Sequence, residues 1–217
     1  MKACIFDLDG TLTNTLNAIA HFGNLALEAY GFKPLPVMDY RHYVGDGRTL
    51  LIHRMLNAHN ADTPENFQKV CQVYDEHYEA DPMYDTNAYS GIPELLNELK
   101  QNNIKIAVCS NKPDNVVQDV VKIIFGDIFD IVCGVIDGEP TKPNPHTALK
   151  IAEKLDVSPE ECLFIGDTNV DIFTSKNAGM TSVGVTWGFR DRHELIDAGA
   201  EYIVDLPSDI SKIIEKL

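Results

Sequence analysis

The chain has 217 residues, of which 44% are hydrophobic and 24% are charged, values that are typical of a folded globular protein and exclude a largely disordered one. Its 33 acidic residues outnumber its 18 basic residues, which gives a formal net charge of -15. A surface this acidic repels nucleic acid and anionic lipid, so we expect neither to be the main partner.

No apolar run approaches the roughly 18 residues that a membrane helix needs. The first acid, Asp7, comes too early for a secretory signal. Both features favour a cytoplasmic protein. The five cysteines form no CxxC pair, and we expect them to be buried, reduced thiols. They are Cys4, Cys71, Cys109, Cys133 and Cys162.

Five short and nearly continuous apolar runs alternate with longer segments of helical periodicity. Such runs are typical of strands that are buried on both faces. The alternation predicts a parallel sheet with helices on both faces. We therefore expect a three-layer, Rossmann-like α/β core around a five-stranded sheet. The predicted strands are 3–6, 104–109, 131–135, 162–165 and 182–185, and the predicted helices between them are 92–101, 113–124, 145–155 and 170–178.

A long helical excursion separates the first predicted strand from the second. Between them, residues 15–85 carry helical periodicity and no convincing strand. A crossover connection needs only about a dozen residues, so this segment predicts an inserted all-helical domain. The expected core domain then consists of residues 1–14 and 86–217.

An acid pair, Asp7 and Asp9, follows the first predicted strand directly. Ligands of open parallel sheets bind at the carboxyl ends of the strands. One carboxylate can attack phosphorus, and the other can protonate the leaving oxygen and later deprotonate water. Gly10, with Thr11 beside it, permits a tight turn whose amide groups face an anion. Taken alone, the pair fits a polar turn at a strand end equally well.

A second acid pair, Asp167 and Asp171, follows the predicted strand 162–165. Asp171 lies one helical turn beyond Asp167 if Thr168 or Asn169 caps a helix there. Oxygen ligands without a nearby His or Cys pattern favour Mg²⁺ over zinc. Ordinary capping acids at a helix start would give the same pattern.

Two further polar elements lie between the acid pairs. Ser110 and Asn111 end the predicted strand 104–109, where they can bind phosphate oxygens, and Lys142 lies in the loop 141–145. A solvated lysine, or helix-starting Ser and Asn, would explain each of them singly. Together, however, acid pair, hydroxyl, lysine and acid pair predict a phosphoryl-transfer site with a metal ion.

These four elements resemble the four motifs of the haloacid dehalogenase superfamily of phosphohydrolases, and the resemblance covers essentially the whole chain. The helical segment 15–85 resembles the small helical (C1-type) cap of that superfamily. Within the superfamily, the chain is most similar to the phosphoglycolate phosphatase group. This similarity rests on residues 44–51 (VGDGRTLL), 142–145 (KPNP) and 184–189 (GVTWGF).

The resemblance implies a role for each matching residue. Asp7 would be the nucleophile and a Mg²⁺ ligand, and Asp9 would be the general acid and base. Ser110 and Lys142 would bind the transferring phosphoryl group, while Asp171 would reach the metal through water or orient Lys142. The implied metal ligands are Asp7, Asp9 (through its backbone carbonyl), Asp167 and Asp171, and the candidate substrate-binding residues are Gly10, Thr11, Asn111 and Arg48.

Arg48 is a candidate for substrate recognition because it follows two glycines in the segment 44–48. Such a loop at a helix start can close over a site, and an arginine there can bind the carboxylate of phosphoglycolate. In the alternative, Arg48 pairs with an acid of the insert, such as Asp46 or Glu76. The aromatic residues of the insert recur at helical spacing, which predicts packing roles for them.

The expected function is a Mg²⁺-dependent phosphatase of small phosphorylated metabolites, with phosphoglycolate first, that works through an aspartyl-phosphate. Asp9 favours phosphate-ester cleavage over dehalogenation, because an alkoxide leaving group needs a proton and chloride does not. A sugar phosphomutase or a pyrophosphatase remains an alternative, and a phospho-acceptor signalling module represents a different class. We expect a monomer or a homodimer.

Overall fold

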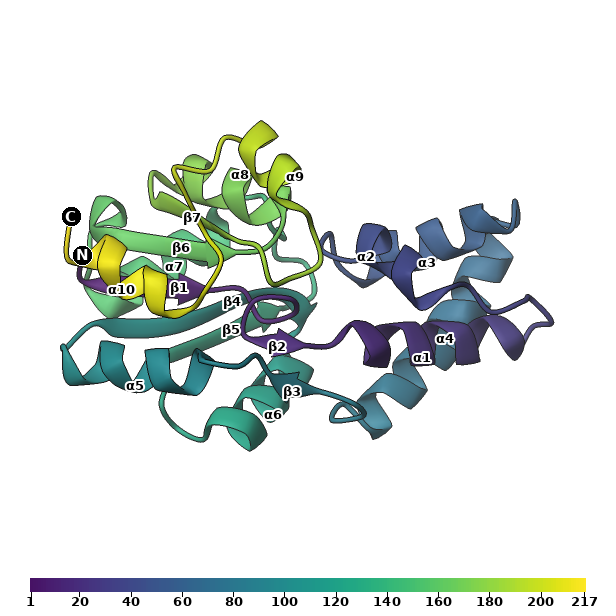
Figure 1. The fold of residues 1–217 in the computed structure, drawn as a ribbon. Coiled ribbons are helices and arrows are strands. Elements are labelled where there is room, and N and C mark those ends of the chain that lie inside the picture. Colours follow the sequence, from purple (N-terminus) through teal and green to yellow (C-terminus); the bar gives the residue numbers. More distant parts are fainter.

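The computed structural model describes the whole chain, from Met1 to Leu217. One parallel sheet of six strands forms its centre, and helices cover both faces (Figure 1). The strands are β1 (Ala3–Phe6), β4 (Lys105–Pro113), β5 (Ile131–Val135), β6 (Cys162–Gly166), β7 (Thr181–Val185) and β8 (Tyr202–Val204). Their order is β5-β4-β1-β6-β7-β8, and every neighbouring pair is parallel. The predicted α/β architecture with a parallel sheet is confirmed.

The prediction of five strands was wrong, because it missed β8. This strand has three residues, and only Val204 among them is fully buried. A strand this short and this exposed has no continuous apolar run from which it could be predicted. It pairs with β7 at the edge of the sheet, where short strands are common because they offer little backbone for unwanted pairing.

Side chains of β1 alternate between two hydrophobic clusters, one on each face of the sheet. Cys4 and Phe6 belong to the larger cluster, and Ala3 and Ile5 belong to the smaller one. Because both faces are covered, all four residues are fully buried. The helices on the first face are α5 (Ile92–Gln101), α6 (Asp114–Phe125) and α10 (Ser208–Ile214), and those on the second are α7 (His146–Leu155) and α8 (Asn169–Ala178).

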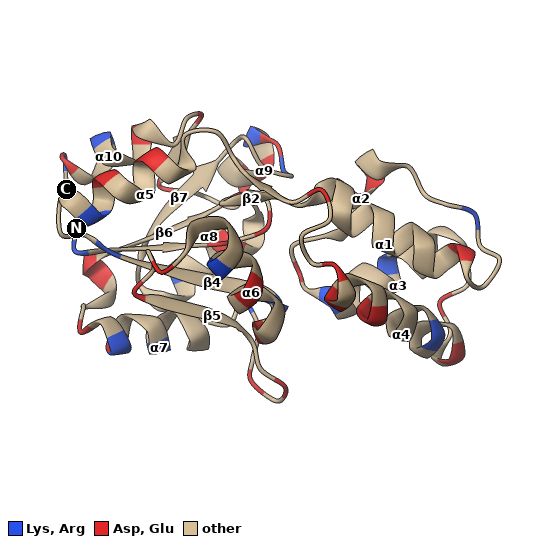
Figure 2. Ribbon diagram, turned by 90° about the horizontal axis from the view of Figure 1, so that it is seen from below, with Lys and Arg blue, Asp and Glu red and all other residues tan.

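The segment between β2 (Thr13–Asn14) and β3 (Asn87–Ala88) contains helices joined by loops and no strand, as predicted. The two short strands pair antiparallel, so the chain leaves and re-enters the core side by side. We call residues 15–85 the helical insert. It forms a separate lobe beyond the sheet (Figure 1). Acidic residues are spread over the helices of both lobes (Figure 2). Its helices are α1 (Leu16–Glu28), α2 (Tyr40–Tyr43), α3 (Arg48–Ala58) and α4 (Pro64–Ala80).

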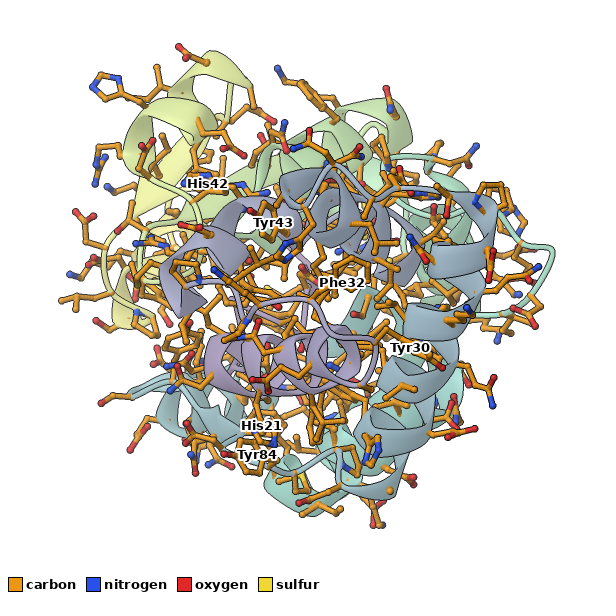
Figure 3. All side chains as sticks on the ribbon, turned by 90° about the vertical axis from the view of Figure 1, so that its right-hand side faces the viewer. His21, Tyr30, Phe32, His42, Tyr43 and Tyr84 are labelled. Carbon is orange, nitrogen blue, oxygen red and sulfur yellow. The ribbon has the colours of Figure 1, made fainter.

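Aromatic side chains help to hold the helical insert together. On the outer side of α1, the ring of His21 stacks on that of Tyr84, with centroids 4.1 Å apart (Figure 3). Phe22 contacts Tyr84 and Tyr78 edge to face at 5.5 Å and 5.1 Å. Aromatic pairs of this geometry add to the free energy gained from the apolar area that they bury. These contacts therefore stabilise the packing of α1 against α4 and the residues that follow it.

Two arginines fasten the helical insert to the core. Arg41 of α2 donates from Nε to the carbonyl oxygen of Phe189 at 2.7 Å. In the other direction, Arg190 of the core donates from Nη2 to the carbonyl oxygen of Val44 at 2.9 Å. Both acceptors are backbone groups, so these bonds fix the position of the insert loop near residue 44 over the end of the sheet.

All five cysteines are free thiols. Cys4, Cys109 and Cys162 are buried as predicted, whereas Cys71 and Cys133 are only half-buried. Cys71 lies on a helix of the insert with one face toward solvent, and Cys133 lies on the edge strand β5. The helices are too short or too polar for any of them to span a membrane.

We predict that Ile5→Ala lowers the free energy of unfolding by about 2–5 kcal/mol, because it leaves a cavity in a fully buried strand. Urea denaturation measures this value. The matched control is Ile123→Ala on α6, whose side chain is 61% exposed; a surface change of this kind should stay within about 0.5 kcal/mol of wild type. Equal losses for the two variants would contradict the assignment of β1 to the buried centre.

Candidate active site

The sheet brings four predicted site residues to one edge. β4, β1 and β6 are neighbours. Asp7 and Asp167 directly follow β1 and β6, and Ser110 lies beside them in the last part of β4. Ligands of open α/β sheets bind at this edge. Lys142 reaches the same place from the loop between β5 and α7, and its side chain is only 2% exposed. The motifs that are far apart in the sequence therefore meet in space.

Lys142 lies between two carboxylates. Its Nζ is 2.9 Å from Oδ1 of Asp7 and 2.7 Å from Oδ1 of Asp171. Burial by itself lowers the pKa of Lys142, but the charges of Asp171 and Asp7 outweigh it and raise the pKa well above its usual range. The ammonium group therefore remains charged and holds the two acids together.

Asp171 has both carboxylate oxygens engaged by the protein. Oδ1 accepts from Lys142, and Oδ2 accepts from the backbone amide and the hydroxyl of Thr168 at 3.1 Å and 2.8 Å. The bond from the Thr168 amide is one half of a capping box at the start of α8. Of the two roles expected for Asp171, the geometry favours the one that orients Lys142.

Asp167 is held by a tight turn after β1. Its Oδ1 accepts from the Thr11 hydroxyl at 2.9 Å, and its Oδ2 accepts from the Phe189 amide at 2.8 Å. Gly10 has a φ of +90°, and a side chain there would overlap the Asp167 carboxylate. Gly10 and Thr11 thus shape the surroundings of an acid. Burial, followed by the charge of Asp171, raises the pKa of Asp167 to about 7.

Asp7 has one carboxylate oxygen free of protein partners. Oδ1 accepts from the Leu8 amide at 2.7 Å and faces Lys142, whereas Oδ2 makes no hydrogen bond within the protein. Burial is the main reason that the pKa of Asp7 lies well above its ordinary value; the charges of Asp171 and Asp167 add to it, and Lys142 opposes it. A positive charge near Asp7 would therefore favour the anionic form.

The three acids form a cluster that suits a divalent cation. Asp7, Asp167 and Asp171 each offer a carboxylate oxygen within 4.8 Å of the others, and all three are buried. Lys142 balances only one of the three charges, so the cluster lacks positive charge. An all-oxygen donor set of this kind fits a hard cation such as Mg²⁺ better than zinc.

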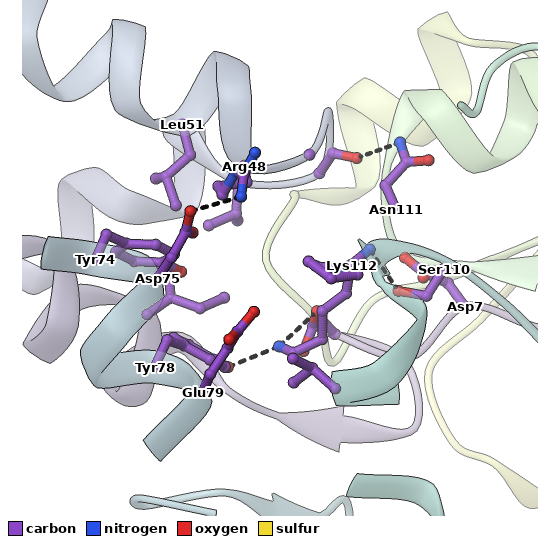
Figure 4. A pocket seen from close by; sticks show the side chains of 17 residues that line it. Asp7, Arg48, Leu51, Tyr74, Asp75, Tyr78, Glu79, Ser110, Asn111 and Lys112 are labelled. Carbon is purple, nitrogen blue, oxygen red and sulfur yellow. Dashed lines mark hydrogen bonds and ion pairs between the residues drawn. The ribbon is translucent and has the colours of Figure 1, made fainter. Parts of the chain in front are cut away.

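A pocket of about 80 Å³ lies between the core and the helical insert, with Asp7, Asp9 and Ser110 among its lining residues (Figure 4). Helices α3 and α4 supply much of the opposite wall. The nearby side chain of Asn111 accepts from the amide of Lys142 at 2.9 Å and donates to the carbonyl oxygen of Gly45 at 3.2 Å. Asn111 therefore connects the lysine loop to the insert.

Arg48 lines the pocket but has an acidic partner there. Its Nη1 lies 2.6 Å from Oδ2 of Asp75 on α4. This is the arrangement expected under the alternative hypothesis, with a different acid. Asp46 pairs instead with Arg54 at 2.6 Å, because α3 turns the two arginines toward different neighbours.

Lys112 is a pocket residue that the sequence analysis missed. Its Nζ contacts Oδ1 and Oδ2 of Asp9 at 3.0 Å and 3.1 Å, and it donates to the Tyr78 hydroxyl at 2.6 Å (Figure 4). The signal was present in the sequence, because three consecutive polar residues, from Ser110 to Lys112, follow an apolar strand. β4 continues through them to Pro113, which places Lys112 at the pocket.

A family model of haloacid dehalogenase-like hydrolases matches residues 1–179. The chain belongs to this family. The phosphoglycolate phosphatase of Vibrio vulnificus (strain CMCP6) is 30% identical over 219 residues, which cover 99% of this chain and 96% of the relative. That of Aquifex aeolicus (strain VF5) is 30% identical over 217 residues, which cover 99% and 97%.

Solved structures agree with these sequence relatives. The crystal structure of a candidate phosphoglycolate phosphatase from Lactobacillus delbrueckii subsp. bulgaricus superposes with a TM-score of 0.93 at 30% identity, covering 98% of each chain. One from Haemophilus somnus gives 0.91 at 28% identity, covering 99% of this chain and 98% of that one. The resemblance to the haloacid dehalogenase superfamily and to its phosphoglycolate phosphatase group is confirmed, and the relatives support a phosphatase of the haloacid dehalogenase type.

We predict that Asp167 destabilises the metal-free protein as the pH rises. Below its ordinary pKa of 3.8, both the folded and the unfolded chain hold its proton. Between 3.8 and about 7 only the folded chain keeps the proton, so the free energy of unfolding falls over this window and the loss is complete above it. Asp167→Asn removes this dependence.

Urea denaturation of both proteins in EDTA measures the effect. The stability of Asp167→Asn relative to wild type should increase from about pH 4 to about pH 8. A difference that does not change with pH would mean that Asp167 ionises in the folded chain as it does in water.

Proposed function

We propose that this hydrolase is a Mg²⁺-dependent phosphatase that cleaves a small phosphomonoester, with phosphoglycolate as the favoured substrate, through an aspartyl-phosphate on Asp7. One observation carries the proposal: Oδ2 of Asp7 is free, while Oδ1 is fixed by Lys142 and the Leu8 amide. A carboxylate held in this way at the edge of a pocket is suited to nucleophilic attack. The names of the relatives support the choice of substrate.

In the first step, Oδ2 of Asp7 attacks the phosphorus atom and the ester oxygen leaves with a proton from Asp9. The products are the alcohol and an aspartyl-phosphate. In the second step, water attacks the phosphorus atom and gives a proton to Asp9, which releases phosphate and the Asp7 carboxylate. Lys142 and the Ser110 hydroxyl bind the oxygens of the transferring group, which carry its negative charge during both steps.

Asp7, Asp167 and the backbone carbonyl of Asp9 would hold Mg²⁺, and Asp171 would act mainly by orienting Lys142. When bound, the ion supplies positive charge that offsets the buried acids and the phosphate. The requirement follows from charge: a phosphate that enters a cluster of three acids and one lysine meets net repulsion.

We further propose that the helical insert, residues 15–85, is a cap domain on a core of residues 1–14 and 86–217. Both parts line the pocket, so a substrate inside it is shielded from bulk water, which strengthens the electrostatic interactions there. The five free thiols support a reducing, cytoplasmic setting. The expected partner is a small phosphorylated metabolite bound by a monomer or a homodimer, with no nucleic acid or membrane involved.

Product analysis separates this function from its alternatives. A phosphatase releases one inorganic phosphate per phosphomonoester, a phosphomutase returns the phosphoryl group to a sugar, and a pyrophosphatase requires pyrophosphate. A phospho-acceptor module accumulates the aspartyl-phosphate without turnover. We expect stoichiometric release of phosphate and glycolate from phosphoglycolate over many turnovers.

We predict that Asp7→Asn abolishes turnover and leaves the fold intact, because an amide has the shape of the carboxylate but is a poor nucleophile. Release of phosphate measures turnover, and circular dichroism checks the fold. The matched control is Asp127→Asn, an exposed acid whose side chain is 84% accessible, which should retain wild-type activity. Near-normal release by pure Asp7→Asn would contradict the aspartyl-phosphate mechanism.

We predict that chelation with EDTA stops phosphate release and that added Mg²⁺ restores it, because the buried acids then regain the positive charge that Lys142 alone does not supply. The assay compares the treated protein before and after readdition of the ion. Full activity of metal-depleted protein in excess chelator would exclude a metal requirement.

A further inference from the structure

The pocket contains a cation and two hydroxyl groups that phosphoryl transfer leaves unused. Given the proposed function, we propose that Lys112, Tyr74 and Tyr78 form the subsite that binds the carboxylate of the substrate, and that Lys112 sets the preference for phosphorylated acids of short length. The two tyrosines would then bind the substrate carboxylate in addition to their predicted packing role.

Lys112 is fixed in the wall of the pocket. Its side chain is 8% exposed, and it extends from the end of β4, two residues beyond Ser110. Its Nζ also lies 4.4 Å from the centre of the Tyr78 ring, which favours a cation. An ammonium group that is held by a strand and shielded from water binds an anion more strongly than one on the surface.

The two tyrosines of α4 offer hydrogen-bond donors to the same space. The Tyr78 hydroxyl accepts from Lys112 and has no acceptor for its own proton, and the Tyr74 hydroxyl makes no hydrogen bond within the protein. Both residues line the pocket, and they are only 4% and 7% exposed. Each hydroxyl therefore has a proton available for an acceptor in the pocket, and an oxygen-rich anion beside Lys112 would provide that acceptor.

The position of Lys112 next to Asp9 sets the length of the substrate. Asp9 must reach the ester oxygen in order to protonate it, and Lys112 is hydrogen-bonded to Asp9. In phosphoglycolate the carboxylate carbon is two bonds from the ester oxygen. A carboxylate this close to the ester oxygen would lie beside Lys112, the neighbour of Asp9. The carboxylate of a longer acid would lie beyond Lys112.

Arg48 is the other cation of the pocket, and it is less suited to this task. Both cations have an acidic partner, Asp75 for Arg48 and Asp9 for Lys112, but the side chain of Arg48 is 38% exposed and that of Lys112 only 8%. Solvent screens a half-exposed ion pair. The structure therefore assigns the carboxylate to Lys112 instead of Arg48, which is the residue that the sequence pattern favours.

The test compares two substrates of similar length, phosphoglycolate and ethyl phosphate, of which only the first has a carboxylate. In Lys112→Met, the ratio of their kcat/KM values should fall by about 10–100-fold, the scale of a lost charge-assisted hydrogen bond. Most of this change should appear in KM for phosphoglycolate. If the loss of Lys112 also impairs proton transfer by Asp9, kcat/KM falls equally for both substrates, so this effect cancels in the ratio.

Three further variants accompany Lys112→Met. Tyr74→Phe combined with Tyr78→Phe keeps the charge and removes both donors, so the ratio should fall by about 3–30-fold. Arg48→Ala should leave the ratio within about threefold of wild type. The matched control, Lys122→Met, removes an exposed lysine of α6 and should leave both substrates unchanged. If Lys112→Met does not fold, the double tyrosine variant carries the test.

The subsite is overturned if the ratio persists in Lys112→Met and in the double tyrosine variant, or if Arg48→Ala abolishes it. An equal loss of kcat/KM for both substrates would mean that Lys112 only positions Asp9 and does not bind the carboxylate, which also contradicts the proposal. Wild type that hydrolyses both phosphates without preference also overturns the subsite while the phosphatase stands. Failure of the proposed function looks different, because wild type would then release phosphate from neither substrate.

Discussion

The buried ammonium group of Lys142 is the interaction on which the end of the sheet depends. It lies between Asp7 and Asp171, almost without solvent, and Asp167 adds a third buried acid nearby. Removing charges from water is costly unless a partner compensates them. Lys142 compensates in part, and the remaining negative charge suits the acid cluster to a cation.

The backbone is built to let these acids come close. Besides Gly10, a glycine at the end of β6 and one in the loop after β7 leave no room for a side chain. A Cβ on Gly166 would overlap the Asp171 side chain, and one on Gly188 would overlap Asp167. Because these positions lie beside or after buried strands, the same hydrophobic packing that stabilises the sheet also fixes the spacing of the carboxylates.

Much of this arrangement could be predicted from the sequence, because strands buried on both faces are continuous apolar runs and the polar residues that end them stand out. Asp7, Ser110 and Asp167 were found in this way. β8 could not be, since its three residues at the edge carry too little apolar pattern.

Pairs between side chains that are distant in the sequence could not be predicted either. Arg48 was expected beside Asp46 or Glu76, but the packing of α3 on α4 gives it Asp75. Lys112 was missed because its partners, Asp9 and Tyr78, are distant in sequence. Local sequence patterns predict which residues end a strand. The packing of the helical insert determines which side chains those residues contact.

The most direct test measures the binding of Mg²⁺ to the protein without substrate. Isothermal titration calorimetry gives the dissociation constant for wild type and for Asp167→Asn. The charge deficit of the acid cluster predicts that wild type binds one ion and that Asp167→Asn binds it at least about 10-fold more weakly, since one buried anionic ligand is lost. Identical binding by the two proteins, or no binding to wild type, would contradict the account.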